Sequence, residues 1–352
     1  MDGETFEVIG GGLQITVQDL GRPGYLAIGM PTAGAQDSFS LRMGNLLVGN
    51  GAGKPFLVGG EPGEAGLEIL LLGPTLKVLR STVVAVTGAD LSCKLNGKPF
   101  PMWTAVRVNE GDIISFGRPV AGARAYLCVA GGIEVPVFLG SRATFIRGAV
   151  GGVQGRALAK GDVLKTGTSK ISLEEIEGRT LMPKLIPQYT KKWDVRVVLG
   201  PQDYLFTEEA IELFLTYEWQ FSSTSDRMGC RFIGPKLNFK PRPDYLVNQA
   251  GSDPSNIVDD TIPVGGIQVP GGLEPIVLAV EGPSLGGYAK VATVIISDMS
   301  RVGQMNAGDL TRFRAVTVDE ATKILRETEK ILSEDSIVKK SKTRLNGGSY
   351  HD

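Results

Sequence analysis

The chain has 352 residues, among them 47 glycines and 20 prolines, and its formal net charge is −1. This length allows two domains with separate hydrophobic cores, and the composition is that of a folded, turn-rich protein. Nucleic acid and anionic membranes are not expected as partners, because both attract clustered positive charge, which is patterned here only in the last residues.

The N-terminal residues and the hydrophobic runs bear on location. The chain begins MDGETFEVIGGG, which is acidic and lacks the apolar core of a signal peptide. No apolar run approaches the roughly 18 residues that cross a bilayer. We therefore expect a cytoplasmic protein with no membrane partner.

Cysteine and histidine usage excludes several kinds of site. The three cysteines, Cys93, Cys128 and Cys230, are odd in number and far apart, which argues against a disulfide framework and a thiolate metal site. Each is expected to be a small buried hydrophobe. The single histidine, His351, is the second-last residue, so a Ser-His-Asp triad or a histidine zinc site is not expected in the folded body. Catalysis would have to use carboxylates, Lys, Arg, Tyr, hydroxyls or backbone amides, and no metal ligand is assigned.

The first half of the chain has the pattern of many short β-strands and one helix. Strands are expected at FEVIG and LQITVQD near the N-terminus, and in the series between Gly66 and Phe116. Between them, SFSLRMGNLLVGN is expected to form an amphipathic helix that Asp37 caps. Many short strands with few helices are typical of a barrel or a sandwich.

The second half follows a polar, irregular linker at residues 166–192. It begins with the strand-like run WDVRVVLGPQ and a helix, TEEAIELFLT, with Thr207 at its cap. A strand, a polar turn and a second strand are expected in WQFSSTSDRMGCRFIG. Residues 236–255 lack periodicity and are expected to form a long loop, a kind of segment that is often functional.

The stretch from Pro275 to Met299, PIVLAVEGPSLGGYAKVATVIISDM, has the pattern of two buried strands flanking a loop rich in glycine. The loop carries Glu281, Ser284 and Lys290, and its glycines would let backbone N–H groups approach an anion closely. An ordinary hairpin turn explains the same pattern.

A Gly-Asp turn recurs along the chain. NEGDIISF at residues 109–116 is echoed by NAGDLTRF at residues 306–313 and, more briefly, by AKGDVL at residues 159–164. Related domains and a common turn type both explain this echo.

The C-terminal pattern completes the expected domain organisation. A helix is expected from Thr317, which forms a capping box with Glu320. We expect an N-terminal β domain at residues 1–190, a C-terminal β domain ending in this helix at residues 191–333, and a mobile tail at residues 334–352.

Four polar, glycine-bearing stretches interrupt the apolar strands and are candidates for a functional site. They are VQDLGRPGY at residues 17–25, PTAGAQD at residues 31–37, TSDRMGCR at residues 224–231 and EGPSLGGYAK at residues 281–290. Each also has a structural explanation: a surface ion pair of Asp19 with Arg22, a helix cap at Asp37, or turn positions for Asp226 and Arg227.

An ordered series of motifs resembles a known family. The series is VQDLGRPGY, AGAQD, NLLVGN, LEILLLGPTL, AVTGA, GPQ, SDRMGCRFIGP, GGIQVPGG and GPSLGGYAKVATVI. It resembles the family that contains the C-type subunit of bacterial 5-oxoprolinase, the KipA regulators, allophanate-hydrolase-like subunit 2 proteins and the carboxyltransferase region of urea carboxylase. The resemblance covers roughly residues 5–316.

The resemblance implies a mainly β fold of two cyclophilin-like β-barrel domains with a few short helices. It also implies a B-type subunit as partner, a KipI or allophanate hydrolase subunit 1-like protein, with the active site near the shared surface. An A-type hydrolase subunit or a biotin carrier is a further implied partner.

Three segments depart from the oxoprolinase pattern within the family. PSLGGY at residues 283–288 stands where many such members have Gln-Thr-Thr-Gly-Gly-Tyr, and DPSNIVDD at residues 253–260 is similar to the urea carboxylase branch. The usual Ser-Gly-Ala-Met-Asp is AGAQD at residues 33–37.

Three functions follow from the resemblance. The first is a C-type component of an ATP-dependent 5-oxoprolinase-like complex, in which ATP with Mg²⁺ activates a lactam or amide carbonyl. The second is a biotin-dependent carboxyltransferase that passes CO₂ from carboxybiotin, carried on another chain, to a urea- or amide-like nitrogen. The third is a KipA-like regulatory subunit without catalysis. The sequence contains neither a Walker A motif nor a Met-Lys-Met biotin attachment site.

The residues expected at the site fall into two groups. Among the catalytic candidates, Arg22, Arg227 and Lys290 are expected to bind an anion or carbonyl. Asp37, Asp226 and Glu281 are expected to be polar orienting groups or metal ligands. The candidates for substrate or cofactor binding are Asp19, Gly34, Ser284, Gly286, Gly287 and Tyr288.

Overall fold

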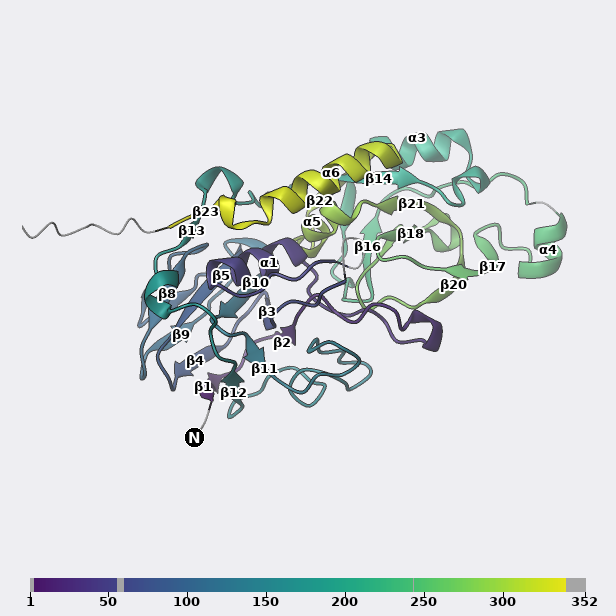
Figure 1. Cartoon of the computed structure of the whole chain (residues 1–352). Coiled ribbons are helices and arrows are strands. Elements are labelled where there is room, and N and C mark those ends of the chain that lie inside the picture. Colours follow the sequence, from purple (N-terminus) through teal and green to yellow (C-terminus); the bar gives the residue numbers. More distant parts are fainter. Residues whose placement is uncertain (1–2, 56–59, 243, 340–352) are drawn as a thin grey trace, which may run out of the picture.

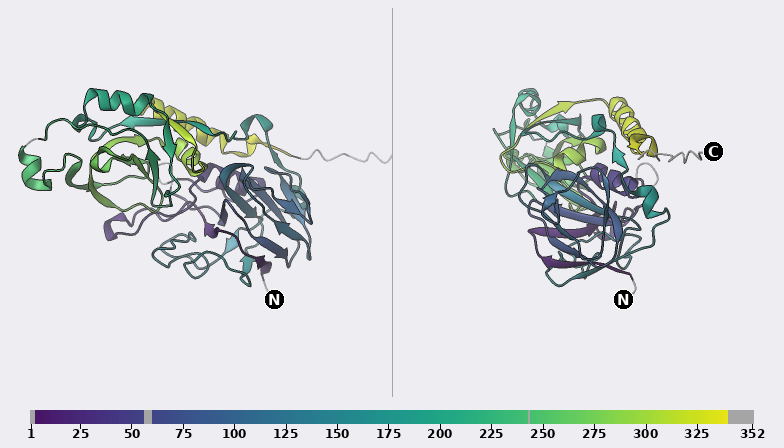
Figure 2. Two further views of the ribbon diagram at one scale, coloured as in Figure 1. Left: turned by 180° about the vertical axis from the view of Figure 1, so that it is seen from behind. Right: turned by 90° about the vertical axis from the view of Figure 1, so that its left-hand side faces the viewer.

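The chain folds into two β-rich halves that lie side by side, with a long helix running across the top of both (Figure 1). This computed structural model describes residues 3–55, 60–242 and 244–339. The same division is visible from behind and from the side (Figure 2). The mainly β class with a few short helices, expected from the sequence, is confirmed.

The first half packs two antiparallel sheets around one core. One sheet contains, in spatial order, β11 (Ile133–Glu134), β12 (Val163–Thr166), β1 (Glu4–Gly10), β4 (Thr75–Val78), β9 (Ile113–Ser115), β6 (Lys94–Leu95) and β7 (Lys98–Pro99). The other contains β2 (Gln14–Gln18), β3 (Gly66–Leu70), β10 (Ala121–Val129), β5 (Thr82–Asp90) and β8 (Ala105–Val108). Side chains from both sheets share one hydrophobic cluster.

Strand β5 is buried on both faces, which explains its continuous apolar sequence. Val84 and Val86 point into the core between the sheets, whereas Val83 and Ala85 belong to a second cluster with α1 (Ser38–Leu47). Alternate residues of a strand face opposite sides, so a strand covered on both sides needs apolar residues throughout. The helix predicted after Asp37 is confirmed, and the Asp37 carboxylate accepts its capping hydrogen bond from the backbone N–H of Ser40.

The second half is a closed barrel. Its strands, in order around the ring, are β14 (Lys192–Leu199), β21 (Lys290–Val294), β18 (Gly266–Gln268), β19 (Ile276–Leu278), β16 (Gly229–Ile233), β15 (Trp219–Phe221) and β22 (Leu310–Ala315). Only β14 and β22 run parallel. Closure leaves none of these strands at an open sheet edge. Phe313 stacks on Phe214 with ring centres 4.7 Å apart, so aromatic side chains fill the barrel core.

Short helices and two small strand pairs complete the fold. The α-helices are α1, α2 (Leu173–Ile176), α3 (Glu208–Thr216), α4 (Asp244–Ala250), α5 (Met299–Gly303) and α6 (Val318–Ile331). The 3₁₀ helices are η1 (Leu26–Ile28), η3 (Pro183–Leu185), η4 (Asp203–Leu205), η5 (Pro270–Gly272), η6 (Ile296–Asp298) and η7 (Glu334–Ser336). The pairs are β13 (Thr180–Leu181) with β23 (Ile337–Val338) and β17 (Asn256–Thr261) with β20 (Leu285–Tyr288).

Three local predictions need correction. The region predicted as a loop at residues 236–255 contains α4. The two strands β19 and β21 do not form a hairpin, because β18 lies between them and pairs with both. The intervening residues instead contain β20, which pairs with β17 outside the barrel.

The C-terminal end also differs from the prediction of a mobile tail at residues 334–352. Residues 334–338 form η7 and β23, and β23 pairs with β13 because the chain turns back toward the linker of the first half. Residues 340–352 lie outside the described residues. The strand arrangement is consistent with the predicted domains at residues 1–190 and 191–333, and this division stays a prediction.

The three Gly-Asp turns share one geometry. In each, an aspartate side chain accepts from a backbone N–H three residues earlier: Asp112 from Asn109, Asp162 from Ala159, and Asp309 from Asn306. The glycine before each aspartate has a φ between 90° and 95°, which suits glycine alone. Two of these turns lie in the same half, so the sequence echo reflects a common turn type.

Buried cysteines and short helices also agree with the sequence. All three cysteines are free and buried, as predicted. Burial raises the pKa of Cys93 to about 12 and of Cys230 to about 11. Among the described residues, no helix combines the length and the apolar character needed to span a membrane.

The capping box at the start of α6 generates a test of the helix. Thr317 accepts from the backbone N–H of Glu320, and Glu320 accepts from that of Thr317. Replacing Thr317→Ala is expected to lower the free energy of unfolding by about 1 kcal/mol. The substitution removes the hydroxyl that accepts from the backbone N–H of Glu320, and with it one of the two bonds of the capping box. Thr322→Ala in the same helix is the control, since alanine favours helices. Chemical denaturation followed by circular dichroism measures both variants; equal effects would contradict the assignment.

Candidate functional site

A fully buried arginine joins the two halves of the molecule. Arg227 donates from Nε to Glu281 and from Nη1 to Glu68, each at 2.5 Å. Its Nη2 donates to the backbone oxygen of Gly34 at 2.7 Å. Glu68 lies on β3 in the first half, whereas Arg227 and Glu281 belong to the barrel half. Each guanidinium nitrogen therefore contacts a protein acceptor, and the side chain bridges the halves.

Charge balance keeps this bridge ionised. Burial disfavours the charge on Arg227, but Glu68 and Glu281 outweigh it and raise the pKa of the guanidinium above its ordinary value. Burial alone would raise the pKa of Glu68. The positive charges of Arg227 and Arg124 have the larger effect, so the pKa of Glu68 lies below its ordinary value. The ion pairs thus compensate the charges that folding removes from water.

Neutral groups complete the bridge. The Tyr126 hydroxyl donates to Glu68 at 2.6 Å and accepts from the backbone N–H of Asp37 at 2.8 Å. The backbone N–H of Gln36 also donates to Glu68, at 2.8 Å. Because buried carboxylate oxygens need several donors, these bonds explain why polar residues are tolerated inside the β3–β10 pair.

Asp37 forms a second polar contact between the halves. Its carboxylate caps α1 and accepts from Gln304 Nε2 at 2.7 Å, and Gln304 follows α5 in the second half. Burial raises the pKa of Asp37 above its usual range. The prediction that Asp37 caps a helix is therefore confirmed. In addition, Asp37 contacts the second half through Gln304.

Asp19 and Arg22 hold the loop at residues 136–152 and do not form a surface pair. Asp19 accepts from Ser141 Oγ and from the backbone N–H of Arg142, both at 2.6 Å. Arg22 donates to the backbone oxygens of Ala143 and Phe138. Burial raises the pKa of Asp19 and lowers that of Arg22. Both side chains are fully buried, which is why the expected surface ion pair is wrong.

Gly34 and Asp226 have local structural roles in this arrangement. Gly34 has a φ of 90°, and a Cβ atom there would lie 2.7 Å from the backbone nitrogen of Gly21. The Asp226 side chain accepts from the backbone N–H groups of Met228 and Gly229 and pairs with the exposed Arg147 at 2.9 Å. Asp226 thus lies at the surface, beside the buried bridge.

A different polar cluster lies where β21 meets the β17–β20 pair, which we call the ribbon. Lys290, the first residue of β21, has no solvent exposure and donates from Nζ to Asp260 at 2.8 Å. Gln202 donates to the same carboxylate at 3.0 Å and accepts from the backbone N–H of Lys290. The side chain of Asp260 is 41% exposed.

This arrangement changes the predicted role of Lys290. Its hydrogen bond to Asp260 lowers the pKa of that carboxyl, so a solvent-facing carboxylate is held ionised by a buried ammonium. Direct binding of an external anion by Lys290 does not fit, because the ammonium is enclosed. Asp260 is the group of this pair that a ligand can reach.

The ribbon lies tightly against the barrel. A Cβ atom on Gly286 would lie 2.6 Å from Ile262 and 2.8 Å from Gln268 Nε2, so close packing explains the glycine. Gln268 Nε2 is buried without a hydrogen-bond partner among the described residues. The backbone oxygen of Ser284 accepts from Ile262, whereas Tyr288 is exposed. Gly286 and Gly287 therefore form part of a strand, and the predicted open cradle is not present.

The structure thus divides the predicted residues between two centres. The junction between the halves brings together Gly34, Asp37, Arg227 and Glu281, with Asp226 at its surface. Asp19 and Arg22 instead hold a loop of the first half. The ribbon cluster contains Ser284, Gly286, Gly287, Tyr288 and Lys290.

Sequence reasoning missed four residues. Glu68 is a carboxylate inside the apolar run LEILLLG, which is a recognisable signal of a buried partner. Asp260, Gln202 and Gln268 lie in motifs that carry the resemblance, but nothing local links them to Lys290.

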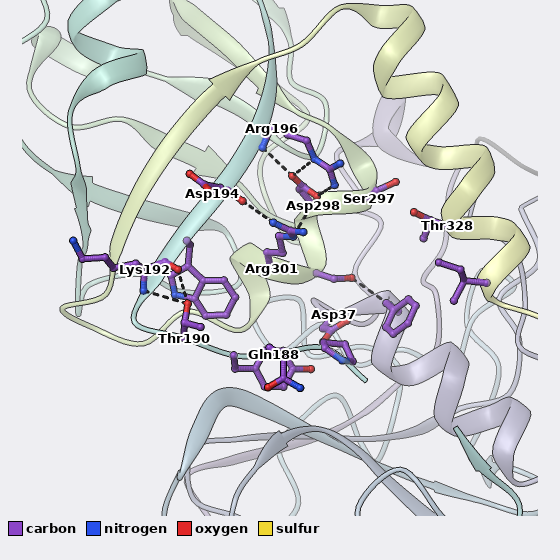
Figure 3. A pocket seen from close by; sticks show the side chains of 16 residues that line it. Asp37, Gln188, Thr190, Lys192, Asp194, Arg196, Ser297, Asp298, Arg301 and Thr328 are labelled. Carbon is purple, nitrogen blue, oxygen red and sulfur yellow. Dashed lines mark hydrogen bonds and ion pairs between the residues drawn. The ribbon is translucent and has the colours of Figure 1, made fainter. Parts of the chain in front are cut away.

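A cavity of about 420 Å³ opens between α6, β14 and η6 (Figure 3). Arg196 pairs with Asp298 at 2.5 Å, and Arg301 lies 3.5 Å from the same carboxylate. The charges of Arg196, Asp298 and Arg301 in this wall therefore partly compensate one another. Within the described ranges, no group of three or more His, Cys, Asp or Glu side chains is placed to hold a metal ion.

The bridge generates a stability prediction. Replacing Arg227→Met is expected to lower the free energy of unfolding by about 3–5 kcal/mol, because Glu281 loses its ion pair and Glu68 keeps only Arg124, at 3.6 Å. The loss should be larger at pH 8 than at pH 5. In the parent, the lowered pKa of Glu68 contributes stability above its unfolded pKa. In the variant, Arg124 alone no longer outweighs burial, so the pKa of Glu68 rises and stability falls as pH rises.

Arg147→Met, which removes the exposed neighbouring pair, is the control and should change stability by less than about 1 kcal/mol. Urea denaturation at both pH values measures all three proteins. A loss for Arg227→Met that does not grow with pH would argue against the buried carboxylates as its cause.

Comparisons with known proteins place this geometry in a family. A family model described as "Carboxyltransferase domain, subdomain A and B" matches residues 28–315. Urea amidolyase of Lachancea kluyveri is 35% identical over 329 residues, which are 91% of this chain but 17% of that protein. The C-type subunit of Haemophilus influenzae 5-oxoprolinase is 34% identical over 315 residues, which are 89% of this chain and 92% of that protein.

A solved structure agrees with the sequence relatives. The crystal structure of Kluyveromyces lactis urea carboxylase matches with a TM-score of 0.85 and 36% identity. The match covers 96% of this chain and 31% of that one, so this chain corresponds to a minor part of the larger protein. Both the matched range and the near full-length relative lead to one conclusion: the chain belongs to the family of carboxyltransferase domains, subdomains A and B, which includes the C-type subunit of 5-oxoprolinase.

Proposed function

We propose that this chain is a component of a carboxyltransferase that acts on the nitrogen of a small amide or urea-like compound, together with a B-type subunit. The observation that carries the proposal is the ribbon. Its strands β17 and β20 come from DPSNIVDD, which resembles the urea carboxylase branch, and PSLGGY, which departs from the oxoprolinase pattern. They pair with one another beside Lys290 and Asp260.

The chemistry of the cluster supports recognition of an amide or urea nitrogen. Asp260 offers an ionised, solvent-facing carboxylate, which accepts hydrogen bonds from N–H groups. Lys290 and Gln202 fix the position of that carboxylate. In this proposal Asp260 binds and orients the substrate nitrogen, and Lys290 is a positioning residue that fixes the Asp260 carboxylate.

A biotin-dependent reaction would also need a carboxyl donor close to Asp260. Carboxybiotin, arriving on another chain or domain, would supply an activated carboxyl group. The unpaired Nε2 of Gln268 is enclosed behind Gly286 of the ribbon, so it does not reach a donor directly. In this proposal the donor therefore approaches from the surface shared with the B-type subunit, while Asp260 holds the acceptor.

A second function, ATP-dependent activation of a lactam in a 5-oxoprolinase-like complex, is supported by a different observation. The 5-oxoprolinase relatives match this chain over nearly their whole length, 92% in Haemophilus influenzae and 95% in Escherichia coli. In that case, Mg²⁺ and ATP would be held together with the partner.

A purified complex with the B-type partner distinguishes the functions. Carboxylation of urea or an amide that depends on a biotin carrier supports the proposal, whereas ATP hydrolysis that depends on 5-oxoproline supports the second function. A stable complex without either turnover indicates a regulatory protein of the KipA kind and refutes both.

The contact between Lys290 and Asp260 can be tested by substitution. Lys290→Met, of similar length, is expected to lower kcat/KM of the active complex about 100-fold, because Asp260 loses the group that positions it. The pKa of Asp260 should rise toward its ordinary value, measured by carboxyl NMR titration. Lys192→Met, at an exposed lysine of β14, is the control and should resemble the parent. An unchanged Asp260 pKa would remove the basis of the assignment.

The sequence of the ribbon at residues 283–285 can be tested in the same complex. The combined substitutions Pro283→Gln, Ser284→Thr and Leu285→Thr convert the segment to the oxoprolinase pattern. Carboxyl transfer should fall, while the unfolding midpoint stays near the parent because Pro283 and Leu285 are exposed. Retained carboxyl transfer would show that the ribbon does not select the reaction.

A further inference from the structure

Exposed apolar side chains gather on the ribbon and on α4, at the end of the barrel half that points away from the first half (Figures 1 and 2). We call this surface the ribbon patch. Its members are Tyr245, Val247, Val258 and Leu285, whose exposed fractions lie between 38% and 57%. Single exposed apolar side chains are normal on a protein surface, whereas a contiguous group marks an interaction site.

The pleat of the ribbon explains why part of this group faces away from the barrel. Asp260 and its pairing partner Gly286 face the barrel. Successive residues of a strand face opposite sides, so Leu285 and Thr261, which are paired with one another, face outward. Helix α4 contacts β17, so its exposed side chains adjoin this outward face.

An irregularity in β17 adds Val258 to the outward face. The pairing register shifts between Asn256 and Asp260, which interrupts the alternation of side chains. Ile257 is buried in the barrel core, whereas the next two residues, Val258 and Asp259, are both exposed. The outward face therefore combines apolar side chains with a carboxylate.

The chain around the patch is acidic. Residues 244–261 contain four aspartates and neither lysine nor arginine. Asp260 pairs with Lys290, and two basic side chains that precede α4 lie close enough to Asp253 to act on its charge. Two of the four negative charges are therefore compensated from other segments.

The remaining two aspartates leave negative charge beside the apolar side chains. Among the described residues, neither Asp244, at the start of α4, nor Asp259, on β17, takes part in an ion pair. Like charges that meet across an interface are unfavourable, so this patch would repel a second copy of itself or an anionic membrane. A protein face with apolar side chains beside lysine or arginine would complement it.

We infer that the ribbon patch docks a protein partner whose contact face is apolar and bordered by basic side chains. The partner that we assign to it is the B-type subunit, and this assignment rests on the function proposed above. Asp260 lies on the same strand as Val258 and Asp259, so the docked partner covers one side of the Asp260 cluster. Tyr245 is the expected anchor, because tyrosine is enriched among the residues that contribute most to binding.

Binding of the purified B-type subunit to the full chain tests the apolar part of the patch. The double substitution Tyr245→Ser and Val258→Ser is expected to weaken binding at least about tenfold, because it removes apolar contact area. Val120→Ser, at an exposed valine of the first half, is the matched control and should bind as the parent does. Circular dichroism checks the fold of each variant. Equal affinity of the double variant and the parent would overturn the proposal.

Reversal of one charge tests the acidic part. Asp259→Lys is expected to weaken binding at least about tenfold at low salt, and the difference should shrink at high salt, where ions screen exposed charges. Glu110→Lys makes the same change of charge at an exposed position of the first half and should leave the affinity unchanged. A loss of equal size for Glu110→Lys would show that net charge alone matters, against the proposal.

Binding and turnover report on different parts of the assembly. A complex that depends on Tyr245 and Asp259 but performs no carboxyl transfer would refute the proposed function and leave the docking surface in place. Carboxyl transfer by a complex that these substitutions do not weaken would support the function and overturn the docking surface. The docking surface would also be overturned if the B-type subunit does not bind the parent, or if the double substitution breaks a dimer of the parent chain.

Discussion

The pairing of Arg227 with Glu68 and Glu281 is the interaction on which the arrangement of the molecule depends. The three charges come from both halves and are buried together, so each is tolerable only while the halves remain in contact. Tyr126 and Gln36 supply the remaining hydrogen bonds. An apolar interface of equal size would hold the halves together, but it would permit sliding, whereas this geometry defines one relative position.

That position has different consequences for two parts of the structure. The cavity of about 300 Å³ between the halves exists because loops 20–36 and residues near Val280 are held against one another. The ribbon cluster lies entirely within the barrel half, where Asp260, Gln202 and Lys290 come from three separate segments. The bridge therefore acts as scaffold for the cavity, whereas the cluster depends on the barrel and on the β17–β20 pair packed outside it.

Much of the fold was predictable because its signals are local. The cap at Asp37, the capping box at Thr317 and the strands of the first half were confirmed, since each depends on neighbouring residues. The candidate site was less predictable. Lys290 meets Asp260 through strand pairing across thirty positions, and no periodicity reveals which distant carboxylate a buried lysine will reach. The glycines near Lys290 were predicted to bind an anion. Close packing against Ile262 explains Gly286 instead.

The pairing of β13 with β23 imposes an order on synthesis. Thr180 precedes the whole barrel in the chain, yet its partner Val338 follows it. A growing chain can complete both sheets of the first half early, but β13 must wait until the barrel and α6 have left the ribosome. Until then the edge of β13 and the adjoining face of α1 lack their cover. Strand β23 thus completes the first half, although it is made after the barrel and α6.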